Sequence, residues 1–288
     1  MSKRTWIDPP ADGDAHGAWD SYFQALLDRE RNVSSSDSPR PSAATRFARH
    51  VLDRKARRLW FPGCGLDMAP RLYALLGLEV WASDTTPTAV GFQTALAEAP
   101  DERVWGWGAE IWSRYAQVDA PIPGGRLHAR LHDFRTPFPE AEFDCVLNIR
   151  AFQILVGESL AAAARTHFTA LRPGGEAFFD TQNVQGDERN VLEDALLAAG
   201  FFIPGYEAER WYRSALAATG IKFNFILGRP MCPFAQGEEE KAARERDQEV
   251  LESFRLEYEQ RGERERAATE SVRSDPATRT AIVIYNTG

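Results

Sequence analysis

Strands that alternate with helices between residues 58 and 181 are the feature that most constrains how this chain folds. Apolar or alternating runs typical of strands lie at 58–61, 78–83, 126–131, 143–148 and 175–180. Segments with helical periodicity lie between most of them, at 67–76, 86–97 and 157–171. This alternation predicts βαβ units with right-handed crossovers, and therefore an α/β domain with a doubly wound, mostly parallel sheet.

The segment before this alternation is expected to form a separate N-terminal helical cap over 1–57. Trp19, Tyr22, Phe23 and Leu26 recur at helical spacing and predict a helix over about 17–29. A Ser/Pro-rich connector follows, and a second helix is expected at about 42–55. The two Gly-flanked tryptophans at 105 and 107 argue against a regular helix in their own segment.

The remainder of the chain extends the expected domain to 58–288. Helices are expected at 188–199 and 206–219, and strands at 221–227 and 279–288, which would complete a seven-stranded sheet.

A charged helical insert is expected at 228–278, before the last strand. Twelve acidic and seven basic side chains lie between 238 and 270, in a chain whose net charge is −8. One apolar stripe can dock a stretch of a long helix there: Val250, Leu251, Phe254 and Tyr258. Such helices are most often solvated, and a partner-binding element is the alternative.

Charge and composition exclude several classes of protein. The net charge of −8 argues against a sequence-independent grip on nucleic acid, which needs a clustered basic surface. No run of eighteen apolar residues is present, and the N-terminus lacks a secretory pattern, so a cytoplasmic protein is expected. Cys64, Cys145 and Cys232 are too widely spaced for a disulfide framework, and no metal-ligand spacing is found.

A glycine loop follows the first expected strand, in the run Leu59-Trp-Phe-Pro-Gly-Cys-Gly-Leu-Asp-Met68. Glycines let a backbone approach a nucleotide-like ligand without a Cβ in the way, and the next helix offers free N-terminal amides. Asp84 closes the following strand 21 residues after Gly63, close to the ~20 typical of a carboxylate that accepts both ribose hydroxyls. The loop and Asp84 together predict an adenosine-binding site.

The residues after this loop argue against a dinucleotide. Met68 stands where dinucleotide-binding folds place a third glycine, and Asp67 stands where it would repel a pyrophosphate. An acidic residue suits the positive end of a helix dipole but not a diphosphate. The pattern therefore favours an adenosine ligand without phosphates, and S-adenosylmethionine (SAM), with its cationic sulfonium, fits.

Three motifs together resemble the class I SAM-dependent methyltransferase superfamily: Trp60-Phe-Pro-Gly-Cys-Gly65, Ala82-Ser-Asp84 and Leu171-Arg-Pro-Gly-Gly175. The loop with its following Asp-Met is similar to the thiopurine-methyltransferase-like, small-molecule branch. The resemblance covers about 58–182 well and 183–288 only in outline, because the family sheet usually ends in a compact hairpin. It implies a Rossmann-like methyltransferase fold, with SAM as cofactor and S-adenosylhomocysteine as product.

The resemblance also implies roles for residues at the ends of the strands. The methionine end of SAM is implied to contact Pro62, Gly63, Cys64 and Gly65. The ribose is implied to contact Asp84 and Thr85, and the adenine His132, Asp133 and Phe134. Those implied to lie beside the transferable methyl are Asn148, Ile149, Arg150 and Phe152. Arg150 and His132 are the candidates for a catalytic role.

The acceptor pocket is expected to be covered by aromatic side chains, namely Trp19 and Phe23 of the N-terminal helix, and Trp105 and Trp107. For the Trp-rich segment, which also contains Trp112, a simple core role for one or two of its tryptophans is an equal alternative.

Other candidates have structural interpretations too. Asp84 could merely cap the helix that begins near Thr86. Arg150 could pair with a core carboxylate instead of facing substrate. Cys64 is expected to be a packed residue, because no basic neighbour in sequence would lower its pKa.

The function predicted from these patterns is methyl transfer from SAM to a small molecule by direct displacement, which needs alignment more than a catalytic base. A non-catalytic scaffold that binds a protein partner, a nucleic-acid methyltransferase and a nicotinamide oxidoreductase are the alternatives. The sequence leaves open whether oxygen, nitrogen or sulfur is methylated, the pathway and the oligomeric state.

Overall fold

The computed structural model describes residues 16–32, 43–140, 142–182, 187–226, 229–233 and 238–286. The chain divides into two compact units, Met1–Phe202 with Pro276–Gly288, and Ile203–Asp275. The second unit begins earlier than the insert expected at 228–278, because helix α8 (Tyr206–Thr219) packs with the long helix α9 (Glu238–Ser274).

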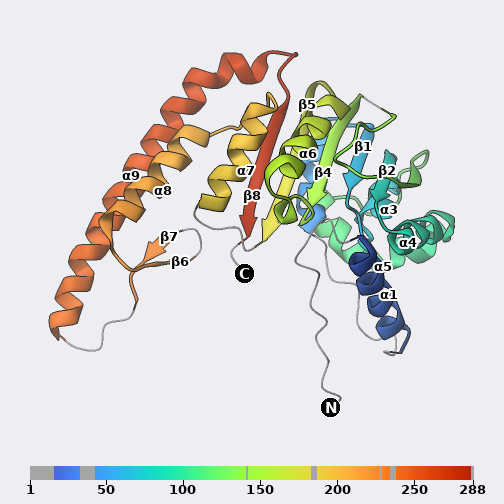
Figure 1. Ribbon diagram of the computed structural model, residues 1–288, viewed down its shortest axis with the longest axis horizontal. Coiled ribbons are helices and arrows are strands. Elements are labelled where there is room, and N and C mark those ends of the chain that lie inside the picture. Colours follow the sequence, from blue (N-terminus) through green and yellow to red (C-terminus); the bar gives the residue numbers. More distant parts are fainter. Residues whose placement is uncertain are drawn as a thin grey trace. The chain divides into compact units, whose positions relative to one another are not determined.

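A six-stranded sheet forms the centre of the first unit, and every neighbouring pair of strands in it is parallel. Its strands are β1 (Arg58–Pro62), β2 (Glu79–Asp84), β3 (Arg126–Leu131), β4 (Phe143–Ile149), β5 (Leu171–Gln182) and β8 (Thr280–Asn286). The last strand, β8, lies beside β5 although a whole unit separates them in sequence (Figure 1). The predicted doubly wound parallel fold is confirmed.

The strand order β3-β2-β1-β4-β5-β8 reverses direction between β1 and β4. The chain builds outward from β1 through β2 to β3, and then returns to the other side of β1. In open α/β sheets, ligands bind outside the carboxyl ends of the strands at such a reversal. The topology therefore predicts a ligand site at the loops that follow β1 and β4.

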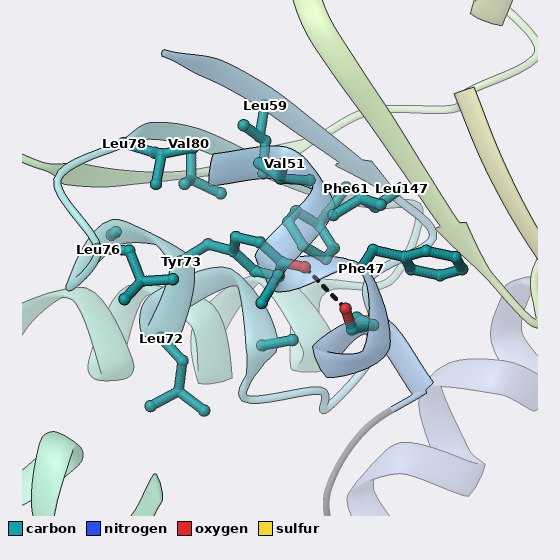
Figure 2. Packing of buried hydrophobic residues seen from close by; sticks show 14 of the residues in the cluster. Phe47, Val51, Leu59, Phe61, Leu72, Tyr73, Leu76, Leu78, Val80 and Leu147 are labelled. Atoms are coloured by element: carbon teal, nitrogen blue, oxygen red, sulfur yellow. Dashed lines mark hydrogen bonds between the residues drawn. The ribbon is translucent and has the colours of Figure 1, made fainter. Parts of the chain in front are cut away.

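One face of the sheet is covered by helices, namely the short helix η1 (Ala43–Phe47), α2 (Ala48–Asp53), α3 (Ala69–Ala74) and α5 (Asp101–Ala116). Their apolar side chains meet alternate residues of the strands, such as Leu59 and Phe61, as the two-residue period of a strand requires (Figure 2). Tyr73 is buried in this core, and its hydroxyl donates a hydrogen bond of 2.7 Å to the Ala44 carbonyl. A buried phenol needs such a partner.

On the other face, strand residues such as Trp60 and Phe179 pack against α6 (Gly157–Ala170). Helix α7 (Asp187–Ala198) follows, and the ring of Phe201, just beyond it, meets Phe168 of α6 edge on. Helix α4 (Pro87–Glu98) connects β2 to α5 and contacts both β2 and β3.

The helix α5 corrects the expectation that the Trp-rich segment would be irregular. Trp112 and Val104 are fully buried and anchor this helix on the core. Gly108 faces α3 so closely that an added Cβ would lie 2.9 Å from a Leu72 methyl carbon. Close packing of two helices therefore outweighs the weak helix propensity of the glycines.

The second unit corrects the expectation of a strand at 221–227 in the main sheet. Among the described residues of this stretch, 221–226, the strand is β6 (Asn224–Ile226), which pairs antiparallel with β7 (Arg229–Met231) in a separate two-stranded sheet. Ile221 and Phe223 pack instead on a cluster built around Leu216 and Leu251, so their alternation serves a local core. The described sheet consequently has six strands rather than seven.

The expected apolar stripe of the charged helix α9 is partly buried within the second unit. Leu251 is fully buried, and the Tyr258 ring stacks on Tyr212 of α8 at 4.7 Å between centroids. Val250 remains 41% exposed. None of the described helices combines the length and the apolar character needed to cross a membrane.

Candidate active site

The glycine loop after β1 makes a turn that only glycine adopts easily. Gly63 and Gly65 have φ of +62° and +49°, in the left-handed region. A Cβ on Gly63 would lie 2.6 Å from the Ala151 Cβ, which no ordinary packing allows. The loop after β1 and the turn after β4 are therefore in direct contact, as the strand order predicts.

Asp84, at the end of β2, is hydrogen bonded to this loop. Its Oδ2 accepts a hydrogen bond of 2.9 Å from the Gly65 backbone N–H, and Oδ1 accepts from the backbone and hydroxyl of Thr86. A carboxylate has about four acceptor positions, and the backbone N–H of Thr85 also donates a hydrogen bond to Asp84. Oδ1 therefore holds the segment at the start of α4, and Oδ2 joins the end of β2 to the glycine loop.

Burial raises the pKa of Asp84, which is 6% exposed, and hydrogen bonds from Gly65, Thr86 and Thr85 oppose this rise. Thr85 itself is half-buried. A hydroxyl donor from a ligand would act in the same direction as those hydrogen bonds and favour the carboxylate.

Cys64 is buried, as expected of a packed residue. Burial raises the pKa of its thiol well above the usual value, and the negative charges of Asp84 and Asp67 raise it further. The thiol therefore stays protonated and is a poor nucleophile. The same two carboxylates give the loop a negative electrostatic potential, which disfavours a diphosphate and suits a cation.

Gln93 of α4 is a site residue that sequence reasoning missed. It is fully buried, and its Nε2 donates to the carbonyls of Gly65 (3.2 Å) and Asp67 (2.7 Å). These bonds hold the glycine loop against α4. A polar residue among the inward positions of the expected 86–97 helix was the available signal.

The loop after β3 reaches Asp84 through the backbone, because the His132 N–H donates to the Asp84 carbonyl at 2.9 Å. Burial lowers the pKa of the half-buried His132. Asp133 forms a close ion pair with Arg135, with 2.6 Å between Oδ2 and the guanidinium. The Phe134 ring is mostly buried, and it would touch a Cβ on Gly63 at 3.2 Å.

The turn after β4 presents Arg150 in the left-handed region, with φ of +60°. Its N–H donates to the Asp180 carbonyl at 2.8 Å, and its half-exposed guanidinium lies 4.0 Å from the Asp180 carboxylate. Asp180 lies near the carboxyl end of β5 and is buried, as Asp84 is at the end of β2. Sequence reasoning missed Asp180, although its place near the end of a strand was a signal.

Three further candidates near β4 differ in exposure. Ile149 is half-buried, whereas the side chains of Asn148 and Phe152 are buried. The Phe152 ring packs on Phe179 at 4.7 Å between centroids. The structure thus brings the backbone of this turn, rather than these two side chains, toward the glycine loop.

Helix α1 (His16–Asn32) lies against the glycine loop. A Cβ on Gly65 would lie 3.0 Å from the tip of the Phe23 ring, and Asp20 accepts a hydrogen bond of 2.9 Å from the Thr88 N–H at the start of α4. Trp19 is half-buried and packs on Phe23 at 5.7 Å between ring centroids. The structure therefore brings Trp19 and Phe23 to the same loop as Asp84.

The tryptophans of α5 are placed differently. Trp105 packs on the core cluster beside α3, which matches the alternative core role, and the Trp107 side chain lies outside the part of the chain that is described.

A pocket of about 440 Å³ opens near the start of β3, lined in part by Arg71, Arg126 and His128. None of the expected cofactor residues lines it. Within the described residues, no group of three or more His, Cys, Asp or Glu could hold a metal ion.

The fold is a doubly wound α/β domain, and its glycine loop and the acidic end of β2 meet at the strand reversal, where such folds bind ligands. A family model described as a methyltransferase domain matches residues 62–179, from the end of β1 into β5. Residues 62–179 of this chain are therefore similar to a methyltransferase domain, over less than half of the chain's length.

Several solved structures are distantly similar. A TehB-like SAM-dependent methyltransferase from Corynebacterium glutamicum is 18% identical and matches over 61% of this chain and 83% of that one, with a TM-score of 0.38. The CcbJ methyltransferase from Streptomyces caelestis is 17% identical over 50% of this chain and 54% of that one, with a TM-score of 0.35.

A further solved structure, from work on the conversion of a disulfide bond into a thioacetal group during echinomycin biosynthesis, is 20% identical to this chain, with a TM-score of 0.38. The match covers 56% of this chain and 57% of that one, little more than half its length. No curated protein matches the chain.

Proposed function

We propose that the protein transfers a methyl group from SAM to a small-molecule acceptor by direct displacement. The observation that carries this proposal is the hydrogen bond from the Gly65 N–H to the Asp84 carboxylate, which joins the glycine loop and the acidic end of β2 at one edge of the sheet. The methyltransferase-domain match over the same residues supports it.

The residues of the glycine loop fit the methionine end of SAM. Pro62 through Gly65 carry no large side chain at the turn, and the carboxylates of Asp67 and Asp84 lie near it. A negative potential at this loop favours a sulfonium cation. Asp84, with Thr85 beside it, would accept a ribose hydroxyl.

The loop after β3 would face the adenine. His132 is tied to the Asp84 backbone, and Asp133 and Phe134 follow directly, so the loop adjoins the proposed ribose position. Phe134 supplies an apolar ring edge beside Gly63.

Arg150 would act at the acceptor, on the exposed side of the β4 turn. When bound, SAM would supply a methyl group on a cationic sulfur. The acceptor's lone pair would displace S-adenosylhomocysteine from this methyl group, and a protonated acceptor would lose its proton to solvent. Arg150 can orient an anionic or polar acceptor, and the Asp180 carboxylate lies 4.0 Å from its guanidinium. Trp19 and Phe23 would exclude water above the loop, which favours an aligned displacement.

Isothermal titration of SAM into the parent protein and an Asp84→Asn variant tests this proposal. We expect the parent to bind, and the variant to bind at least about tenfold more weakly, because a hydrogen bond to a charged acceptor is lost. Asp53→Asn is the matched control, since Asp53 is an exposed aspartate at the end of α2, before β1 begins. A parent protein that does not bind SAM, or a folded Asp84→Asn variant that binds equally well, would refute the proposal.

The acceptor itself is found by a screen of small molecules for release of S-adenosylhomocysteine. Turnover of any acceptor at a rate that depends on Arg150 favours an enzyme over a non-catalytic scaffold. Binding of SAM without turnover, together with capture of a defined protein partner through α9, favours the scaffold.

A further inference from the structure

His167, in α6, has no part of its side chain exposed. Four aromatic rings surround it at centroid distances of 5.2 to 5.6 Å: Trp60, Phe134, Phe152 and Phe179. A polar ring in such apolar surroundings is costly unless its nitrogens have partners. Both nitrogens of His167 have one.

The two partners fix which nitrogen carries the proton. Nδ1 lies 2.7 Å from the Ala163 carbonyl, and Nε2 lies 3.0 Å from the side-chain nitrogen of Asn148. A carbonyl can only accept, so Nδ1 donates; the neutral ring then has a bare Nε2, which accepts from Asn148. Burial supports this neutral state, because it lowers the pKa of His167 to about 4.

Asn148 passes this constraint to the turn after β4. Because its nitrogen donates to His167, its oxygen faces the turn and accepts from the Phe152 N–H at 2.9 Å. Between these two residues lie Arg150, with its left-handed backbone, and Ala151, whose Cβ abuts Gly63. The amide orientation of Asn148 therefore sets how the turn meets the glycine loop.

We propose that His167 is a positioning residue for the methyl-transfer site: through Asn148, it holds the 149–152 turn against the glycine loop and keeps Arg150 directed toward the acceptor. This inference rests on the proposed function for the identity of the ligand. Its structural part, that a buried imidazole in α6 orders a turn at the end of β4, stands independently.

A second contact from the same ring points to the same loop. Phe134, which meets the His167 ring edge on, also touches the space beside Gly63. His167 thus supports both segments that border Gly63, one by a hydrogen-bond relay and the other by ring packing.

Two variants of matched size separate the relay from packing. His167→Phe keeps an aromatic ring but offers Asn148 no acceptor, whereas His167→Gln can place an amide oxygen near the position of Nε2. Hydrogen exchange of the peptide covering 149–154, followed by mass spectrometry without ligand, measures the turn directly. Titration of SAM measures the consequence. Asn148→Leu, which removes both hydrogen bonds from the other side, is a second route should His167→Phe not fold.

We expect faster exchange in the 149–154 peptide of His167→Phe and Asn148→Leu, with parent-like exchange in His167→Gln. SAM affinity should fall at least about tenfold in the first two and remain within about threefold in the third. Parent-like exchange in a folded His167→Phe, or equal impairment of the Phe and Gln variants, would overturn the proposal. If the parent does not bind SAM, the proposed function fails, while the exchange comparison still decides the role of His167.

Discussion

Acidification should destabilise this protein through His167, because the ring is neutral and buried in the folded state but free to take a proton when the chain unfolds. Burial lowers the pKa of His167 from the ordinary 6.5 to about 4. The folded state therefore binds fewer protons than the unfolded state between these values. Stability from this group is fully present above pH 6.5 and is lost as the pH falls toward 4.

The size of this loss follows from the shift. A difference of about 2.5 pKa units corresponds to about 3 kcal/mol at about 1.4 kcal/mol per unit, reached once the pH is below both values. At pH 4.5 most of the loss, about 2.5 kcal/mol, is already present. His167 is fully buried, so solvent does not screen the effect.

Urea unfolding at pH 7 and pH 4.5, followed by far-ultraviolet circular dichroism, measures the free energy of unfolding at each pH. Carboxylates also titrate in this range, so the parent is compared with His167→Gln, which lacks the imidazole and keeps the rest. We expect the parent to lose about 2.5 kcal/mol more than the variant between the two pH values. Equal losses in both proteins would show that His167 is not buried in its neutral form, and would refute the reasoning.

Three further predictions concern the glycine loop and its neighbours. Gly65→Ala should lower the free energy of unfolding, measured in urea, by about 1 kcal/mol or more, because the φ of Gly65 is positive and Phe23 lies close. The control Gly91→Ala, in the open middle of α4, should raise the free energy of unfolding by up to about 1 kcal/mol. Equal effects of the two substitutions would contradict this reasoning. Asp20→Ala should cost about 1 kcal/mol by removing the acceptor at the start of α4, and should speed tryptic cleavage in α1; unchanged cleavage would count against that contact. Cys64 should resist iodoacetamide at pH 8 in the native protein and react in urea, as peptide mapping would show, because its pKa is raised; native alkylation would place it in a different environment.

Much of the fold could be predicted because the relevant signals are local. The periods of strands and helices, the glycine turn after β1 and the acidic end of β2 depend on residues close in sequence, and the structure has the expected elements there. Two expectations were wrong for a common reason: that 221–227 would form a strand of the main sheet, and that the Trp-rich segment would not form a regular helix. Apolar alternation and helix propensity do not state which partner a segment buries itself against.

The candidate site divides in the same way. Gly63 and Asp84 could be proposed from the sequence because their residue types and spacing are informative in themselves. Gln93, His167 and Asp180 were missed because each acquires its role from burial beside a residue distant in sequence. The roles of the predicted cofactor and acceptor residues remain predictions.

The sequence by itself determined the class of domain, since the order of strands and helices and the glycine loop leave few alternatives to a doubly wound sheet. Only the tertiary structure decided that Asp84 divides its two oxygens between α4 and the glycine loop, that α1 lies on this loop, and that a buried histidine orients the turn after β4. The physical reason is range. Periodicity and turn chemistry act over a few residues, whereas the direction of a hydrogen bond inside the core depends on which distant strand and helix pack together.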